Sequence, residues 1–136
     1  MISLQDVHKA FGPKKVLEGV SLEVHEGETV AMIGYSGTGK SVAIKHIVGL
    51  LDPDRGTVFV DGLEVPRLTR PELNALRTRI GYVFQFAALF DSISVGDNVA
   101  MGLRKQGRHS EREIIEHVHE ALTLVDLPDA AELFPI

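Results

Sequence analysis

The sequence predicts an α/β fold arranged around a phosphate-binding loop, and three observations support this prediction. Residues 34–41 match the pattern G-x-x-x-x-G-K-[ST] in full. A run typical of a buried strand, residues 29–33, comes directly before this loop, and a run typical of a helix, residues 42–51, follows it. Strand-like segments fill most of the chain before the loop, and helix-like segments fill its end. A β-rich entry, one strand-loop-helix unit and a helical tail together indicate an α/β nucleotide-binding fold.

Two strands are predicted ahead of the loop. Residues 2–7 read as the first strand, and residues 16–24 read as the second because apolar and polar side chains alternate there. Residues 11–15 contain Gly-Pro and two lysines, which favour a turn between the two strands. We therefore expect an antiparallel pair at the start of the chain.

Two more strands are predicted after the loop helix. Turn-forming residues at 52–56 precede a strand at 57–60, and Asp61-Gly62 closes it with a second turn. Residues 80–84 read as a further buried strand that stops at Gln85. Further strands are thus expected after the loop helix in the sequence.

Helical patterns occupy the remaining segments. Residues 42–51 are apolar nearly all round, which is typical of a helix buried against a sheet. Thr69-Arg70-Pro71-Glu72 opens a short helix with a cap and a proline in its first turn. Residues 94–105 and 110–125 predict two helices, the second with a capping box at Ser110 and Glu113. These two helices form the predicted helical end of the chain.

The loop itself carries the chemistry of triphosphate binding. Its glycines let consecutive backbone N–H groups point inward around an anion, and the next helix adds the positive end of its dipole. Lys40 is expected to reach the β- and γ-phosphates, and Ser41 to bind Mg²⁺. The alternative is a flexible turn that matches the pattern by chance, at odds of about one in a few hundred. The predicted phosphate contacts are Gly34, Ser36, Gly37, Thr38, Gly39, Lys40 and Ser41.

Composition narrows the class of protein. The net charge of −5 disfavours nucleic acid as a partner, and the lack of cysteine excludes disulfides, thiolate metal sites and cysteine nucleophiles. No stretch has the length and apolarity of a secretory signal or a membrane span. His117 and His119 point to different faces of a helix, so we expect no metal site among the histidines of this region. A cytosolic protein that contacts a membrane only through a partner fits this composition.

Several motifs resemble those of the ATP-binding cassette (ABC) transporter ATPases. The loop has the form G-x-S-G-x-G-K-S, a turn of sequence G-L-L-D-P-D-R-G lies behind its helix at 49–56, and Val-Phe-Gln stands at 83–85. Tyr35 is a mild departure from the family pattern. More narrowly, the segments 84–92 and 97–100 resemble the ATPase subunits of Mla/Mce-type lipid transport systems.

The resemblance implies roles for two residues outside the loop. Phe11 matches the aromatic residue that stacks on adenine, although a phenylalanine there could instead anchor the core of the hairpin. Gln85 matches the residue that contacts Mg²⁺ or the attacking water and senses the γ-phosphate. With Lys40, Gln85 forms the implied catalytic pair, and Ser41 and Gln85 are the implied Mg²⁺ contacts.

The resemblance also implies a fold, an activity and partners. Residues 1–85 would form the β-rich N-terminal and P-loop core part of an ABC ATPase domain, and residues 86–136 the exit from Gln85 and a partial helical subdomain. The complete protein would hydrolyse ATP to drive lipid or phospholipid transport, at the cytoplasmic face of a bacterial inner membrane. It would act as a homodimer bound to membrane permease subunits. The implied docking segment comprises Phe86, Ala87, Ala88, Leu89 and Phe90, unless this run packs into the core instead.

Other motifs of the family do not occur in the sequence. The signature L-S-G-G-Q, the strand that ends in Asp-Glu and the switch histidine are absent. We therefore expect the chain to be an N-terminal part, truncated before the signature motif and inactive as an ATPase by itself. Three alternatives remain: an ABC ATPase for another substrate, a non-catalytic nucleotide-binding fragment, and a P-loop small-molecule kinase. A GTPase is disfavoured because no N-K-x-D motif is present.

Overall fold

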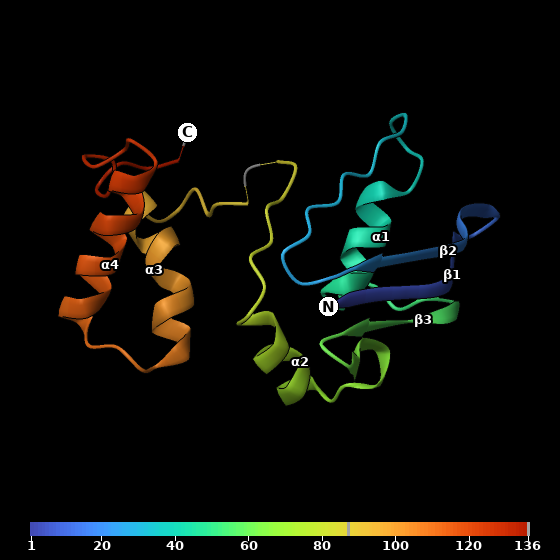
Figure 1. The fold of residues 1–136 in the computed structure, drawn as a ribbon. Helices are drawn as coiled ribbons and strands as arrows, with labels where there is room; N and C mark the ends of the chain where they lie inside the picture. Colours follow the sequence, from blue (N-terminus) through green and yellow to red (C-terminus); the bar gives the residue numbers. More distant parts are fainter. Residues whose placement is uncertain (87, 136) are drawn as a thin grey trace. The chain divides into compact units, whose positions relative to one another are not determined.

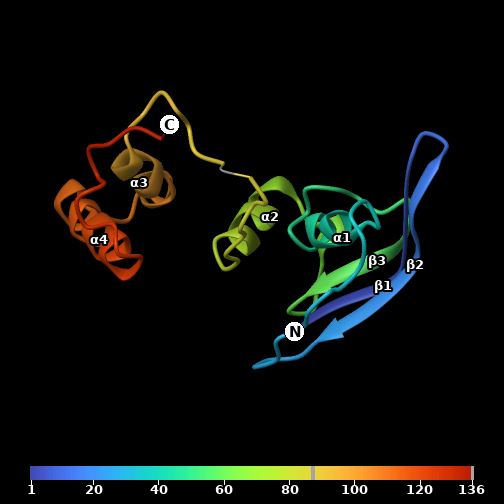
Figure 2. The same ribbon diagram turned by 90° about the horizontal axis from the view of Figure 1, so that it is seen from above.

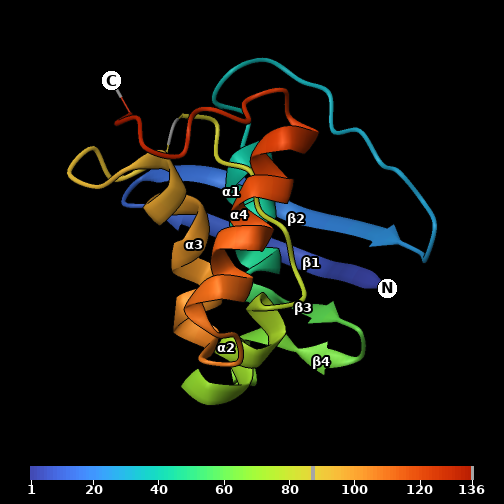
Figure 3. The same cartoon turned by 90° about the vertical axis from the view of Figure 1, so that its left-hand side faces the viewer.

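The N-terminal part of the structure is built on a four-stranded antiparallel sheet (Figure 1). The computed structural model describes residues 1–86 and 88–135, which divide into the units Met1–Tyr82 and Val83–Ile136. The strands are β1 (Ile2–Phe11), β2 (Lys14–Val24), β3 (Arg55–Val60) and β4 (Leu63–Glu64), in the order β2-β1-β3-β4. The strands predicted at 2–7, 16–24 and 57–60 are confirmed. The two-residue strand β4, which lies beside β3 (Figure 3), was too short for the sequence pattern to reveal.

Helix α1 (Lys40–Ile47) packs against one face of this sheet, as the view in Figure 2 shows. A short 3₁₀ helix, η1 (Val65–Arg67), and helix α2 (Arg70–Arg77) contribute to the same core. Apolar side chains of the strands and these helices bury one another almost completely, and this contact makes the core of the unit. Its buried members are Leu4, Val7, Leu17, Ala43, Val58, Val60, Val65 and Leu76.

The helix predicted at 42–51 is shorter than expected. It ends at Ile47 because Gly49 adopts a left-handed backbone conformation, with φ of 63°, that closes the helix. The side chain of Arg77 in α2 donates hydrogen bonds to the carbonyls of Val48 (2.9 Å) and Gly49 (2.8 Å). These bonds satisfy carbonyl groups that a helix end leaves without intrahelical partners. Helix α2 itself starts as predicted, with a capping box between Thr69 and Glu72.

The strands predicted at 29–33 and 80–84 are wrong. Neither run belongs to a strand, and Ile33 and Val83 are each 95% exposed. A strand requires a ladder of hydrogen bonds to a neighbour. Among the described residues, the sheet consists of β1 to β4, and these strands pair with one another rather than with either run. Apolar composition alone therefore did not decide the local structure of these two segments.

The C-terminal unit is a pair of helices, α3 (Val95–Gln106) and α4 (Glu111–Leu124). Both predicted helices are confirmed, as is the capping box of Ser110 and Glu113. Their contact buries Ala100 of α3 against a stripe of α4 formed by Ile114, Val118 and Leu122. Among the residues that the structure describes, no helix combines the length and the apolarity needed to cross a membrane.

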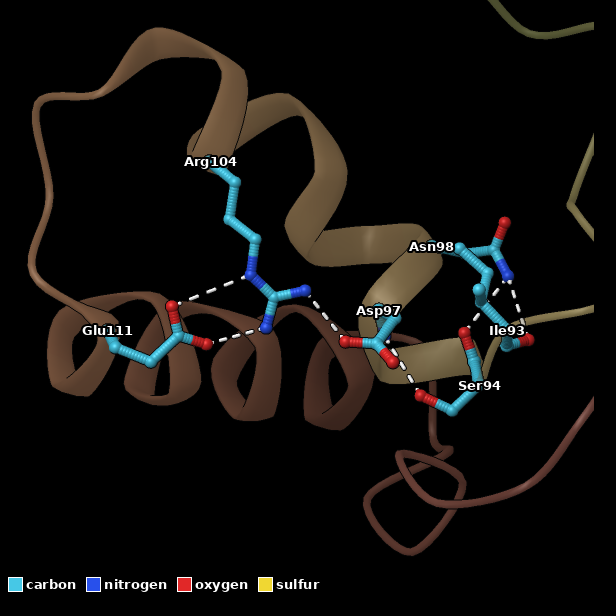
Figure 4. A network of polar contacts seen from close by, with 6 residues as sticks. All are labelled: Ile93, Ser94, Asp97, Asn98, Arg104 and Glu111. Atoms are coloured by element: carbon cyan, nitrogen blue, oxygen red, sulfur yellow. Dashed lines mark hydrogen bonds and ion pairs between the residues drawn. The ribbon is translucent and has the colours of Figure 1, made fainter.

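A three-membered charge network links these two helices (Figure 4). Arg104 of α3 donates to Asp97 on its own helix (Nη1 to Oδ1, 2.7 Å) and to Glu111 on α4 (Nη2 to Oε1, 2.5 Å). These hydrogen bonds from Arg104, with a further one from Ser94 to Asp97, hold the pKa values of Asp97 and Glu111 below their ordinary range. The network therefore adds a polar link beside the apolar contact of the helix pair.

The first prediction concerns Gly56, where β3 passes close to β1. Gly56 has φ of +84°, and an added Cβ would lie 2.2 Å from the Asp6 carbonyl oxygen and 2.4 Å from that of Gln5. Gly62 has a similar φ of +79° but open space around an added Cβ. We expect Gly62→Ala to cost about 1–2 kcal/mol through its backbone conformation, and Gly56→Ala about 1–3 kcal/mol more through overlap. Urea unfolding measures both, and equal losses of stability would contradict the close approach.

The second prediction concerns the pH dependence of the charge network. A carboxylate whose folded pKa is lowered stabilises the fold above its unfolded pKa, and this contribution disappears as the pH falls through the folded value. We therefore expect Arg104→Gln to lower the midpoint of thermal unfolding at neutral pH, with a gap to the wild type that closes below about pH 4.

Arg112→Gln is the matched control for this experiment. It removes the same charge from α4, where Arg112 and Glu116 form an ion pair with side chains 90% and 60% exposed. Exposed pairs of this kind contribute little. An equal effect of the two substitutions, or a gap for Arg104→Gln that does not change with pH, would show that the network adds nothing specific.

Candidate functional site

The loop at 34–39 leads directly into the first turn of α1. Gly37 and Gly39 have φ of 82° and 96°, which turns the chain sharply into the helix. Gly39 is the N-cap residue, no side chain caps the helix, and its first turn contains no acidic residue. The N–H groups of a first helical turn have no intrahelical acceptor, so they are available to donate hydrogen bonds to a ligand. The arrangement suits an anion, since donors and the positive helix end converge on one place.

Lys40 lies across this loop. Its ammonium donates to the carbonyls of Gly34 (2.6 Å) and Tyr35 (2.7 Å), and the Thr38 hydroxyl also donates to Tyr35 (2.9 Å). Lys40 has no carboxylate partner within the described part of the chain. A Cβ added to Gly34 would lie 3.0 Å from the Thr38 hydroxyl and 3.9 Å from the Lys40 ammonium, so a side chain there would crowd the cradle. The loop thus holds a positive charge that no acidic side chain neutralises.

The end of the loop rests directly on β2. An added Cβ on Gly39 would lie 2.9 Å from the Val16 carbonyl oxygen and 2.9 Å from Leu17 Cδ2. Only glycine can therefore bring the backbone this near to the strand at a φ of +96°. No sequence pattern indicates this contact, because Val16 and Leu17 are predicted only as strand residues.

Phe11 lies near this contact along the hairpin. It is the last residue of β1 and pairs with Lys14, the first residue of β2, two positions before Val16. The residue is 47% exposed, and the Lys9 ammonium lies over its ring, 5.8 Å from the centroid. Phe11 is therefore not a buried core residue of the hairpin, which was the alternative that its sequence position allowed.

Gln85 and the segment after it belong to the C-terminal unit. Gln85, Phe86, Ala88, Leu89 and Phe90 are all exposed, with Phe86 at 79% and Phe90 at 58%. Ala87 lies outside the described residues. The described members of the predicted docking segment are thus at the surface of their unit.

Asn98 of α3 fixes the end of this segment, a role that was not predicted from the sequence. Its side-chain oxygen accepts from the Phe90 N–H at 2.7 Å, and its amide donates to the Phe90 carbonyl at 3.0 Å. The same amide lies 2.9 Å from the Ser94 carbonyl and 3.3 Å from that of Ile93 (Figure 4). Asn98 therefore acts like a strand partner for Phe90, a role that has no local sequence signature.

The described residues contain no cluster of side chains that could bind a metal ion by themselves. These residues contain no group of three His, Cys, Asp or Glu side chains placed to hold a metal ion. His109 and His117 meet edge to face, with ring centroids 5.3 Å apart. Ser41 is exposed in the first turn of α1, where its hydroxyl is available as an oxygen ligand.

Comparisons with known proteins agree with this geometry. The sequence profile of the ABC transporter family matches residues 17–134. A chloroplastic protein of Arabidopsis thaliana, "Protein TRIGALACTOSYLDIACYLGLYCEROL 3", is 44% identical over 136 residues. "Probable ribonucleotide transport ATP-binding protein mkl" of Mycobacterium leprae is 40% identical over 134 residues, and "Methionine import ATP-binding protein MetN" of Mesorhizobium japonicum is 40% identical over 135.

The matches cover this chain almost entirely but only part of each relative. They span 98–99% of this chain and 37–39% of those three proteins. A bacterial ABC transporter cassette solved as a dimer has a TM-score of 0.91 and 32% identity, over 99% of this chain and 62% of that one. A dimeric post-hydrolysis cassette bound to ADP and Pi gives a TM-score of 0.90 and 31% identity, with the same coverage.

Proposed function

The chain belongs to the ABC transporter family, and from this premise we propose that it binds Mg-ATP as part of a transporter's ATPase subunit. The observation that carries the proposal is the uncapped glycine loop at the start of α1, with the Lys40 ammonium held over it by two carbonyls. Donors and a positive charge with no acidic partner are the groups that a triphosphate requires. The rival kinase and GTPase functions lack comparable support from the family match.

Each residue of the site has a defined part in this proposal. The amides of the loop bind phosphate oxygens, and Lys40 turns from the carbonyls of Gly34 and Tyr35 toward the β- and γ-phosphates. Lysine has three donor hydrogens, so it can keep one bond to a loop carbonyl while it contacts the nucleotide. Phe11 stacks on the base. Ser41 contributes a hydroxyl ligand to Mg²⁺. This ion typically binds only one or two protein groups, together with phosphate oxygens and water molecules, and its charge stabilises the phosphates.

We propose ATP hydrolysis coupled to transport for the full-length protein, with Gln85 reporting the state of the γ-phosphate to the transporter. Lipid is the proposed cargo. Its support is the segment 84–92, together with the galactolipid in the printed name of the Arabidopsis relative. The other relatives carry names of ribonucleotide and methionine transport proteins, so an ABC ATPase for a different cargo is the second candidate.

The proposed partners are a second ATPase subunit and a membrane permease. Both similar structures are dimers, which supports a homodimer. The exposed side chains of Phe86, Leu89 and Phe90 offer aromatic and aliphatic anchors of the kind that bind a helix in a groove. We place the permease on this segment and the subunit at the cytoplasmic face of the membrane.

The third prediction concerns Lys40. Two unit charges about 4 Å apart at an effective dielectric constant near 20 interact by about 4 kcal/mol, so this side chain dominates the contact with phosphate. Lys40→Ala should weaken Mg-ATP binding by at least about tenfold in calorimetry. Lys105→Ala removes the same charge from an exposed position on α3 and should leave the affinity unchanged. Equal affinities for wild type and Lys40→Ala, with circular dichroism showing a folded protein, would refute the assigned role.

The fourth prediction concerns the permease. Residues 1–136 contain no cysteine, so Ala88→Cys in the full-length protein, with any cysteine beyond residue 136 replaced by serine, gives a single reactive position in the docking segment. It should form a cross-link with a cysteine scanned along the cytoplasmic loops of the cognate permease, in a yield that ATP alters. Ala121→Cys, exposed on α4, is the control and should not cross-link. If no loop position reacts with Ala88→Cys, the segment does not dock the permease.

A further inference from the structure

A polar clasp joins the turn after α1 to the end of β1. The Asp54 carboxylate accepts from the Lys9 ammonium (Oδ1, 2.9 Å) and from the Ala10 N–H (Oδ2, 2.7 Å). Lys9 also donates to the Asp52 carbonyl at 2.8 Å, and the Asp54 N–H donates to the His8 carbonyl at 2.9 Å. Three successive residues of β1 are thereby tied to the turn, and the next residue along the strand is Phe11.

The clasp lies on the edge of β1 that faces β3, beyond the point where β3 begins, whereas on the opposite edge Ala10 and Phe11 still pair with β2. Strand β3 begins at Arg55, which pairs with His8, so the last residues of β1 extend beyond their neighbour on that side. The Ala10 N–H would lack a ladder partner there, and the Asp54 carboxylate accepts its hydrogen bond instead. Side-chain hydrogen bonding to the backbone thus continues the sheet where no further strand residue follows.

The same clasp acts on the aromatic ring. Lys9 is only 16% exposed at its side chain, and its ammonium is the group that lies over one face of Phe11. Because the Asp52 carbonyl and the Asp54 carboxylate hold this ammonium, the cation cannot leave the ring without breaking both bonds. The hydrogen bond from Lys9, followed by that from Ala10, also lowers the pKa of Asp54, so the carboxylate is charged at neutral pH.

We propose that Asp54 is a positioning residue for the nucleotide base: through Lys9 and the Ala10 amide, its carboxylate holds the Phe11 ring in the orientation that stacks on the base. This inference rests on the proposed ATP binding and extends it to a residue outside the phosphate loop. The turn that carries Asp54 directly follows α1, whose first residues form the phosphate site. One segment therefore supports both the helix that binds phosphate and the ring that binds the base.

A first experiment needs no nucleotide. Residues 1–136 contain no tryptophan, so Phe11→Trp in the full-length protein, with any tryptophan beyond residue 136 replaced by phenylalanine, places a single indole fluorophore at the ring position. Adding Asp54→Ala should lower the fluorescence anisotropy of this indole and raise its quenching by acrylamide, because the clasp no longer restrains it. Adding Asp52→Ala, which removes a neighbouring carboxylate but keeps the carbonyl that Lys9 contacts, should change neither value. Identical fluorescence with Asp54→Ala and Asp52→Ala would overturn the proposal.

A second experiment separates the base from the phosphates by comparing Mg-ATP with Mg-tripolyphosphate, which lacks the base. Asp54→Ala should weaken ATP binding by about two- to tenfold, the range expected for a lost aromatic stack. Tripolyphosphate binding should stay unchanged. Combining Asp54→Ala with Phe11→Ala should weaken ATP binding no further than Phe11→Ala alone, because both changes remove one interaction. Asp54→Asn, which keeps two polar atoms in place without the charge, should recover part of the affinity and provides a milder variant if Asp54→Ala fails to fold.

The outcomes distinguish this inference from the proposed function. Equal loss of both ligands in Asp54→Ala would show that the clasp supports the loop or the fold and not the ring, and the positioning role would be wrong. Unchanged ATP binding would exclude it as well. If the wild type binds neither ligand, the proposed function itself fails, and the base-positioning role fails with it.

Discussion

The approach of Gly39 to β2 is the constraint on which the rest of the N-terminal unit depends. A backbone that almost touches the Val16 carbonyl leaves no room for a side chain, and it fixes the first turn of α1 against the sheet. From that fixed start, α1 covers the apolar face of the strands, and no side chain caps its first turn. The geometry of the phosphate loop is thus a consequence of how the helix is seated on the sheet.

Features that depend on residues close together in the sequence could be predicted from it. Features that depend on contacts with residues far away in the sequence could not. The caps at Thr69 and Ser110 could be identified because a capping box involves residues only three positions apart. The glycine loop at 34–39, which we propose binds phosphate, could be identified because its pattern is equally local. The expected strands at 29–33 and 80–84 were wrong because a ladder needs a neighbour, which an apolar run does not specify. The contacts of Asp54 and Asn98 were not predicted either. Asp54 contacts residues far away in the sequence, and the contact of Asn98 with Phe90 has no local motif.

Asp54 and Asn98 solve one physical problem in the two units. Each side chain forms hydrogen bonds with backbone groups that would otherwise bond to a neighbouring strand or helix. Asp54 accepts from the Ala10 N–H, and Asn98 bonds to the N–H and the carbonyl of Phe90. The hydrogen bonds of Asp54 are the stronger ones, because a charged carboxylate makes stronger hydrogen bonds than a neutral amide. In each unit, the supported segment carries an exposed aromatic ring, Phe11 in one and Phe90 in the other.

The pairing of β1 with β3 has a consequence for how the N-terminal unit folds. β1 and β2 are joined by a short turn, whereas the β1–β3 ladder encloses the entire loop and α1 between its two strands. Contacts this distant in sequence form late and slow the folding of a chain. The entropy of closing such a loop nevertheless grows only with the logarithm of its length, by about 0.6 kcal/mol for each doubling. Added residues in the exposed stretch at 25–30 would therefore delay the sheet very little, which leaves that stretch free to vary in length.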